Sequence, residues 1–233
     1  MLRYLLTGGG DVKDYIIHLL LCIPIIFLSL SLHETAHGYV ASKLGDPTAK
    51  NLGRLTLNPI KHLDPIGFIC MLLMGFGWAK PVPINTRYFK KPRRDMAISA
   101  IAGPISNILL AVIFAVLLKL FYVLIPYVFP RYPSELVLNI LSYTSVFLYY
   151  GISLNISLAV FNLLPVPPLD GSRFFYVFLP PKYYFGVMRY ENYISIAVMV
   201  LLFVGALDPI LSFARNGIMN LIFGPLGLNA FIY

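Results

Sequence analysis

Long apolar runs constrain this chain more than any other feature of its sequence. Four stretches, at about residues 15–40, 96–125, 136–164 and 193–211, are each long enough for a helix to cross a bilayer. A helix satisfies its own backbone hydrogen bonds in lipid, and the short alternating segments of a strand barrel do not occur. We therefore predict a fold of the α class, a polytopic integral-membrane helical bundle. The composition agrees, because 58% of the 233 residues are hydrophobic and only 12% are charged.

The region after the first predicted span is polar and basic, with one short apolar piece at residues 66–78. That piece is too short to span comfortably, so we expect a re-entrant or interfacial segment. Pro81 and Pro83 then alternate with other residues, which favours extended chain over helix. Residues 217–233 are apolar but interrupted by glycine and proline, and the pattern leaves their topology open. We predict one membrane-embedded domain over residues 1–233.

Lysine and arginine are unevenly distributed among the predicted loops. Most lie between residues 41 and 95 or after the third span, at Lys43, Lys50, Arg54, Lys61, Lys80, Arg87, Lys90, Lys91, Arg93, Arg94, Arg173, Lys182 and Arg189. Positive residues favour the cytoplasmic side, so we predict that these loops are cytoplasmic, with the N-terminus outside the cell membrane. The net charge of +8 then reflects topology and lipid headgroups, and we expect no nucleic-acid partner.

Three ionisable residues lie close together in the first span, within His33-Glu34-Thr35-Ala36-His37. Residues four apart share one face of a helix, so both imidazoles can bind the same zinc ion. Glu34 points to the neighbouring flank, where it can take a proton from a water on the metal. Ionisable groups at membrane depth are costly and mark functional sites, which favours a metal site over a packing role.

Catalytic zinc usually has three protein ligands, so the histidine pair needs a third. His18 lies about 20 Å away along the helix axis and is excluded. His62 and Asp64 are in the polar loop and within reach. Asp170 is better placed, because it follows a helix end broken by prolines at the same predicted membrane face. The next residue, Gly171, permits an unusual backbone conformation there.

Three motifs together resemble the site-2 protease family of intramembrane zinc metalloproteases. They are the histidine motif, Ala102-Gly-Pro-Ile-Ser-Asn107, and Asn162-Leu-Leu-Pro-Val-Pro-Pro-Leu-Asp-Gly171. The resemblance implies that His33, His37 and Asp170 bind one zinc per chain and that Glu34 activates water. It also implies substrates that are single-span or other membrane proteins. No segment resembles a PDZ or CBS domain, so we expect the minimal branch of the family, without the regulation that those domains supply.

Two amides inside the spans are secondary candidates. Asn162 and Asn107 each have the chemistry to hydrogen-bond the scissile backbone or the oxyanion. Each can equally join helices, as polar residues in spans often do. The two interpretations are evenly matched for Asn162, which adjoins the Asp170 motif, whereas helix packing is favoured for Asn107.

Two other functions fit an apolar chain with buried metal ligands. A metal transporter would also place histidines and an aspartate in its spans, but it has no need of a base such as Glu34. A conducting route would need further polar residues in the later spans, and the sequence offers few. A non-proteolytic scaffold for membrane proteins would not need a complete set of ligands and base. Peptide hydrolysis within or beside the bilayer is therefore the function that the sequence favours.

Overall fold

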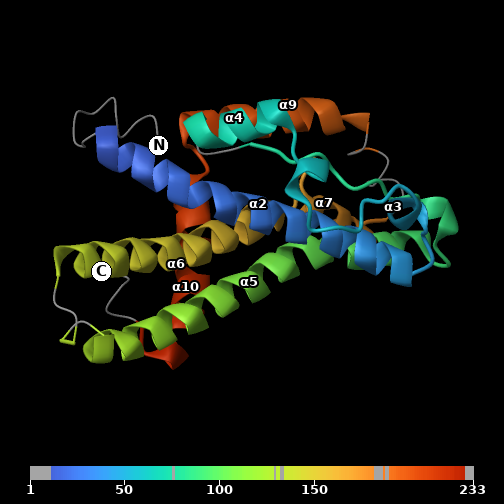
Figure 1. Ribbon diagram of the computed structural model, residues 1–233. Helices are drawn as coiled ribbons and strands as arrows, with labels where there is room; N and C mark the ends of the chain where they lie inside the picture. Colours follow the sequence, from blue (N-terminus) through green and yellow to red (C-terminus); the bar gives the residue numbers. More distant parts are fainter. Residues whose placement is uncertain are drawn as a thin grey trace. The chain divides into compact units, whose positions relative to one another are not determined.

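The computed structural model describes residues 12–74, 77–128, 130–131, 134–180, 186 and 189–228. The regular structure of these residues is helical throughout, and they contain no strand. The chain divides into two compact units, Met1–Gly103 and Pro104–Tyr233. Figure 1 shows the helices of both units in the colours of the sequence. The helical content confirms the predicted α class.

The first unit is built on α2 (Val12–Lys43), a helix of 32 residues. Its C-terminal part packs against two short elements, α3 (Thr48–Asn51) and η1 (Pro59–Lys61), and Figure 1 shows α3 beside this end of α2. Further toward the N-terminus, the rings of Phe27 and Phe68 lie with their centroids 5.2 Å apart, which brings α4 (Pro65–Met74) against α2. The polar loop is thus folded onto one long helix.

The short apolar piece forms α4, a helix of 10 residues. At about 1.5 Å per residue it is roughly 15 Å long, half of a hydrocarbon core of about 30 Å. Residues 75–76, at the end of the expected re-entrant segment, lie outside the described residues. Residues 77–85 then form neither helix nor strand, as the alternating prolines predict, and η2 (Thr86–Tyr88) follows.

The second unit contains most of α5 (Pro92–Val128), α6 (Glu135–Asn162), α7 (Asp170–Phe175) and η3 (Tyr176–Phe178). Ser134 caps α6 by accepting a hydrogen bond from the backbone N–H of Val137 at 3.2 Å. A Cβ on Gly151 would lie 2.5 Å from the ring of Phe114, so glycine is what allows α5 and α6 to approach closely there. α6 also packs against α10 (Asp208–Leu226).

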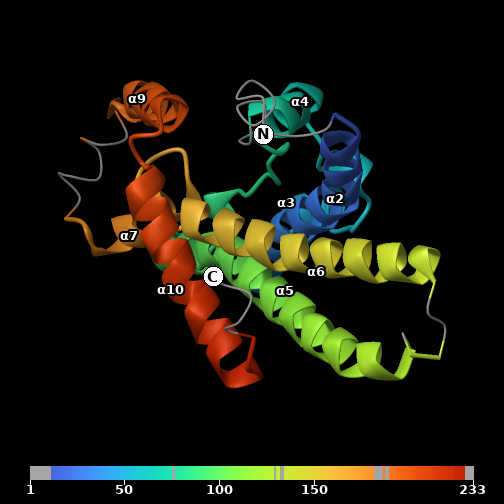
Figure 2. The same cartoon turned by 90° about the vertical axis from the view of Figure 1, so that its left-hand side faces the viewer.

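Three helices among the described residues are long and apolar enough to cross a membrane, at Ile16–Lys43, Pro92–Tyr127 and Glu135–Asn162. The expected fourth span, at about residues 193–211, falls on a pair of helices that are together apolar and long enough for a broken span or a re-entrant loop. α9 (Glu191–Val204) ends at Gly205, whose φ is +78°, and α10 begins at Asp208 with Pro209 in its first turn. The two helices form a bent pair at 80°, which Figure 2 shows from the side.

Residues 217–233, whose topology the sequence left open, begin inside α10. That helix continues through Gly217 and Gly224 to Leu226 and ends at Gly227, which has a φ of +66°. Residues 229–233 lie outside the described residues. With its three spans and one bent pair, the chain is a polytopic helical membrane protein.

Candidate metal centre

His33 and His37 lie one turn apart in the C-terminal half of α2. Both are buried, and their Nε2 atoms are 3.0 Å apart. Two nitrogens bound to one tetrahedral zinc at about 2.0–2.1 Å each would be about 3.3 Å apart. The helix alone therefore brings two imidazole nitrogens to the separation that a shared zinc ion requires.

The other ring nitrogen of His37 contacts the first turns of α5. Its Nδ1 is 2.8 Å from the backbone oxygen of Ser99. A carbonyl oxygen can only accept, so Nδ1 carries the proton and donates. Nε2 is then the nitrogen with the lone pair, which is the tautomer that a metal ligand needs.

Gly103 allows α5 to approach both imidazoles closely. A Cβ at this position would lie 2.3 Å from Nε2 of His37 and 2.6 Å from Nε2 of His33. Any side chain would occupy the volume that adjoins the two ligand nitrogens. The residues present therefore fit a zinc ion: two convergent nitrogens, one of them in a fixed tautomer, beside a helix that approaches them without a side chain.

Glu34 follows His33 directly and is 9% exposed. Its Oε2 accepts a hydrogen bond of 2.7 Å from the backbone N–H of Val82, in the segment that follows α4. Sequence reasoning missed Val82, because no local pattern connects two residues 48 positions apart. The carboxylate is thus held beside the histidine pair by a backbone group.

Asp170 is the first residue of α7 in the second unit, and it is half-buried. The peptide bond between Pro167 and Pro168, just before it, is cis. Gly171 does not use the unusual backbone conformation that glycine permits, because its φ is not positive. Glycine is needed there for space instead: a Cβ would lie 2.3 Å from the backbone oxygen of Leu163. The turn before α7 therefore folds closely onto the end of α6.

The two candidate amides differ in burial. Asn107 is 1% exposed, whereas Asn162 is half-buried and donates from Nδ2 to the backbone oxygen of Leu158 at 3.0 Å. A third amide, Asn155, is fully buried and donates to the backbone oxygen of Gly151 at 2.7 Å. Sequence reasoning missed Asn155, although its spacing of seven residues from Asn162 places both on one helix face.

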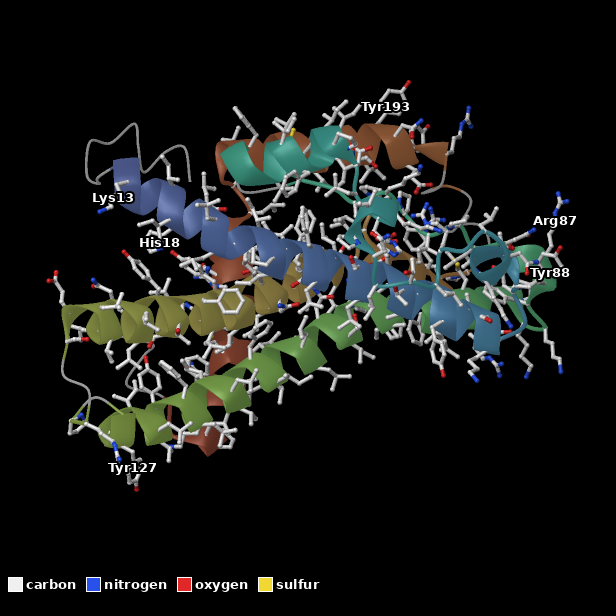
Figure 3. All side chains as sticks on the ribbon, viewed as in Figure 1. Lys13, His18, Arg87, Tyr88, Tyr127 and Tyr193 are labelled. Carbon is white, nitrogen blue, oxygen red and sulfur yellow. The ribbon has the colours of Figure 1, made fainter. Side chains whose placement is uncertain are left out.

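The loop residues considered as a third ligand make local contacts. His62 places Nε2 at 2.7 Å from the backbone oxygen of Thr56, and Asp64 accepts from the backbone N–H of Gly67 at 2.9 Å. The His62 contact links the end of η1 to Thr56, and the Asp64 contact lies at the start of α4. His18 lies near the N-terminal end of α2, next to the labelled Lys13 in Figure 3 and several turns before His33.

Comparison with known proteins decides the family. The sequence model of peptidase family M50 matches residues 21–205, a region that contains all three motifs. The chain belongs to peptidase family M50. This membership confirms the resemblance to site-2 proteases. It identifies the chain as a zinc metalloprotease and not a metal transporter.

Named relatives agree with the M50 assignment. "Putative zinc metalloprotease YwhC" of Bacillus subtilis is 44% identical over 209 residues, covering 86% of this chain and 91% of that protein. "Putative zinc metalloprotease Rip2" of Mycolicibacterium smegmatis is 29% identical over 187 residues, covering 78% and 66%. "Zinc metalloprotease MJ0392" of Methanocaldococcus jannaschii is 28% identical over 160 residues, covering 68% and 34%. No solved structure gives a significant match.

Proposed function

We propose that this M50 metalloprotease hydrolyses peptide bonds of membrane-protein substrates within or beside the bilayer. The observation that carries the proposal is the position of the histidine pair. His33, Glu34 and His37 are buried within Ile16–Lys43, a helix apolar and long enough to cross a membrane. Ionisable residues at that depth are costly and mark functional sites. Single-span proteins are the simplest substrates that reach a site inside the bilayer.

Three residues are proposed to hold one zinc ion per chain. His33 and His37 offer the convergent nitrogens, and Asp170 adds a carboxylate oxygen, as its motif in the M50 sequence implies. When bound, the zinc supplies Lewis-acid activation of a water and of the scissile carbonyl. Two nitrogens and one oxygen leave a fourth position for that chemistry.

Glu34 is proposed as the general base. Its Oε2 accepts from the Val82 N–H, and Oε1 accepts no hydrogen bond from the described residues. Oε1 is then the oxygen that takes the proton of the attacking water and later gives it to the leaving amine. The Val82 N–H fixes the side chain through the other oxygen, so that the base does not need to reorient.

Asn162 is proposed to donate a hydrogen bond to the developing oxyanion. An amide nitrogen carries two hydrogens, and only one is used in the contact with Leu158. Asn107, which is more deeply buried, is proposed to act in helix packing next to Gly103. The two amides thus differ in proposed role as they differ in burial.

The proposed membrane orientation follows the positive charges. The connection between α2 and α5 holds the largest group of lysines and arginines in the chain, which favours the cytoplasmic side. Glu34, His37 and the end of α2 lead directly into that connection. The active site then faces the cytoplasm, and the N-terminus lies outside the cell membrane.

The experiment compares the purified full-length protein with Glu34→Gln and with Glu135→Gln, an exposed carboxylate at the start of α6. Zinc per chain is measured by mass spectrometry, and cleavage is followed with a panel of single-span substrates in lipid vesicles. We expect zinc in all three proteins and a cleavage rate that falls about 10²- to 10⁴-fold in E34Q alone.

Two results would contradict the proposal. Zinc in every protein without cleavage of any substrate would favour a non-proteolytic scaffold. Wild-type protein prepared without chelators that contains no zinc would remove the metal site altogether. Equal cleavage by E34Q and the wild type would leave proteolysis intact but assign the base to another residue.

A further inference from the structure

Residues 80–85, here called the proline segment, are held in place without regular secondary structure. Pro81 and Pro83 have no N–H to donate, so the segment cannot form a full ladder of hydrogen bonds. The Lys80 N–H donates to the backbone oxygen of His62 at 2.8 Å. The backbone oxygen of Asn85 accepts from the N–H of Tyr88 at 3.2 Å. The other backbone hydrogen bonds of the segment go to side chains elsewhere in the first unit.

Asp46 holds the C-terminal end of the proline segment. This carboxylate is fully buried, and its Oδ2 accepts from the backbone N–H of Asn85 at 2.7 Å. Its Oδ1 accepts from the backbone N–H of Thr48 at 2.9 Å and from the hydroxyl of the same residue. Gly45, with a φ of +111°, makes the turn that brings Asp46 to this place after α2.

Arg54 holds the N-terminal end of the same segment. Its Nη2 donates to the backbone oxygen of Lys80 at 2.8 Å and to that of Pro81 at 3.2 Å. Asp46 and Arg54 lie on either side of α3, which packs against α2. Residues on both sides of α3 therefore hydrogen-bond to the two ends of the proline segment.

Val82 lies between the ends held by Arg54 and Asp46, and it makes the contact with Glu34. It is 7% exposed, and its N–H is the donor that reaches Oε2 of Glu34. A shift of the proline segment at either end would move this N–H away from the carboxylate. Misplacement of a reacting group by about 1 Å can cost as much as about 100-fold in rate.

We propose that Asp46 and Arg54 are positioning residues for Glu34, acting through the proline segment and the N–H of Val82. The inference rests on the proposed role of Glu34 as the base. Neither residue touches the histidine pair, so neither is needed for zinc binding. Both act only on the orientation of the carboxylate.

The test uses full-length protein in lipid vesicles with five variants, two of which are controls. Asp46→Asn weakens one end of the segment, and Asp64→Asn is its control, since Asp64 accepts from a backbone N–H outside the segment. Arg54→Met removes the donors at the other end, and Arg87→Met is its control. Arg87 is exposed, and Figure 3 shows its side chain directed away from the ribbon.

We expect D46N and R54M to lower kcat about tenfold while KM and zinc per chain stay at the wild-type values. Arg54→Lys keeps one donor and is expected to recover part of the loss. Hydrogen exchange of the peptide containing Val82 should become faster in D46N and R54M. The two controls should match the wild type in all four measurements.

Each contrary result has a separate meaning. Unchanged kcat in D46N and R54M, with faster exchange at Val82, would overturn the positioning role. A parallel loss of zinc or a rise in KM would also overturn it, because the residues would then support the metal site or substrate binding. If wild type and E34Q cleave equally, the proposed base fails, although the exchange measurement still reports whether the two residues hold the segment.

Discussion

The spacing of His33 and His37 is set by the helix that contains them. The position of Val82 is set instead by side chains from other parts of the first unit. In α2 the backbone repeats every turn, so two ligands four residues apart converge without further support. The proline segment has no such repeat and depends on Asp46, Arg54 and Glu34. The helical site should therefore tolerate the loss of a neighbouring side chain, although not an added atom that clashes with its ligands, while the proline segment should respond to the loss of each side chain that holds it.

The largest effect is expected at the place where α5 approaches the helical site most closely. Gly103→Ala would put a Cβ at 2.3 Å from Nε2 of His37. We expect zinc affinity to fall at least about tenfold, as when a ligand's surroundings are disturbed, and cleavage to fall with it. Zinc per chain, measured over a range of free zinc concentrations, checks this.

Gly217→Ala is the control for that change, because nothing lies within 4 Å of its added Cβ in α10. Alanine there should leave zinc and cleavage unchanged and stabilise the helix by up to about 1 kcal/mol. Full zinc binding by G103A would show that the close approach of α5 at Gly103 is not needed to keep the two histidines in place.

An intermediate effect is expected where the chain turns from α2 toward the proline segment. Gly45→Ala forces a residue with a Cβ to adopt a φ of +111°, at a cost on the order of 1–3 kcal/mol. The Tm should fall, and kcat should fall several-fold because Asp46 is displaced. Gly205→Ala, at a φ of +78° between α9 and α10, should lower the Tm without the loss of kcat. An equal loss of kcat in both would show that strain itself, and not the position of Asp46, reduces activity.

The smallest effect is expected at Ser99. Its backbone oxygen contacts His37, while its hydroxyl donates to the backbone oxygen of Asp95 one turn earlier. Ser99→Ala removes the hydroxyl and keeps the carbonyl, so zinc affinity and cleavage should stay within about twofold of the wild type. A loss of zinc in S99A would mean that the side chain, and not the helix backbone, orients the imidazole.

What the sequence predicted is what depends on local spacing. The long helices and the histidine pair follow from periodicity and hydropathy within a single segment. The break between α9 and α10 was not predicted because most of residues 193–211 are apolar, and only Gly205 and Asp208-Pro209 mark it. Apolar length predicts that a helix can span, but it is insensitive to one glycine in a left-handed conformation.

What the sequence did not predict depends on contacts between distant residues. Val82 and Glu34 are 48 positions apart, Asn85 and Asp46 are 39 apart, and Arg54 reaches Lys80 over 26. Asp46 and Arg54 look like ordinary solvated loop charges when the sequence is read alone. Gly103 is similar: its motif is visible, but its closeness to two imidazoles is a property of the folded chain.

The short length of α4 has a consequence for the order in which contacts can form while the protein is being synthesised. A helix of about 15 Å is shorter than the hydrocarbon core, so we expect the chain from the end of α2 to the start of α5 to stay on one side of the membrane. Glu34, Asp46, Arg54 and the proline segment all leave the ribosome before any of α6. Since chains fold from the N-terminus during synthesis, Glu34 can acquire its backbone partner before the Asp170 motif has been translated.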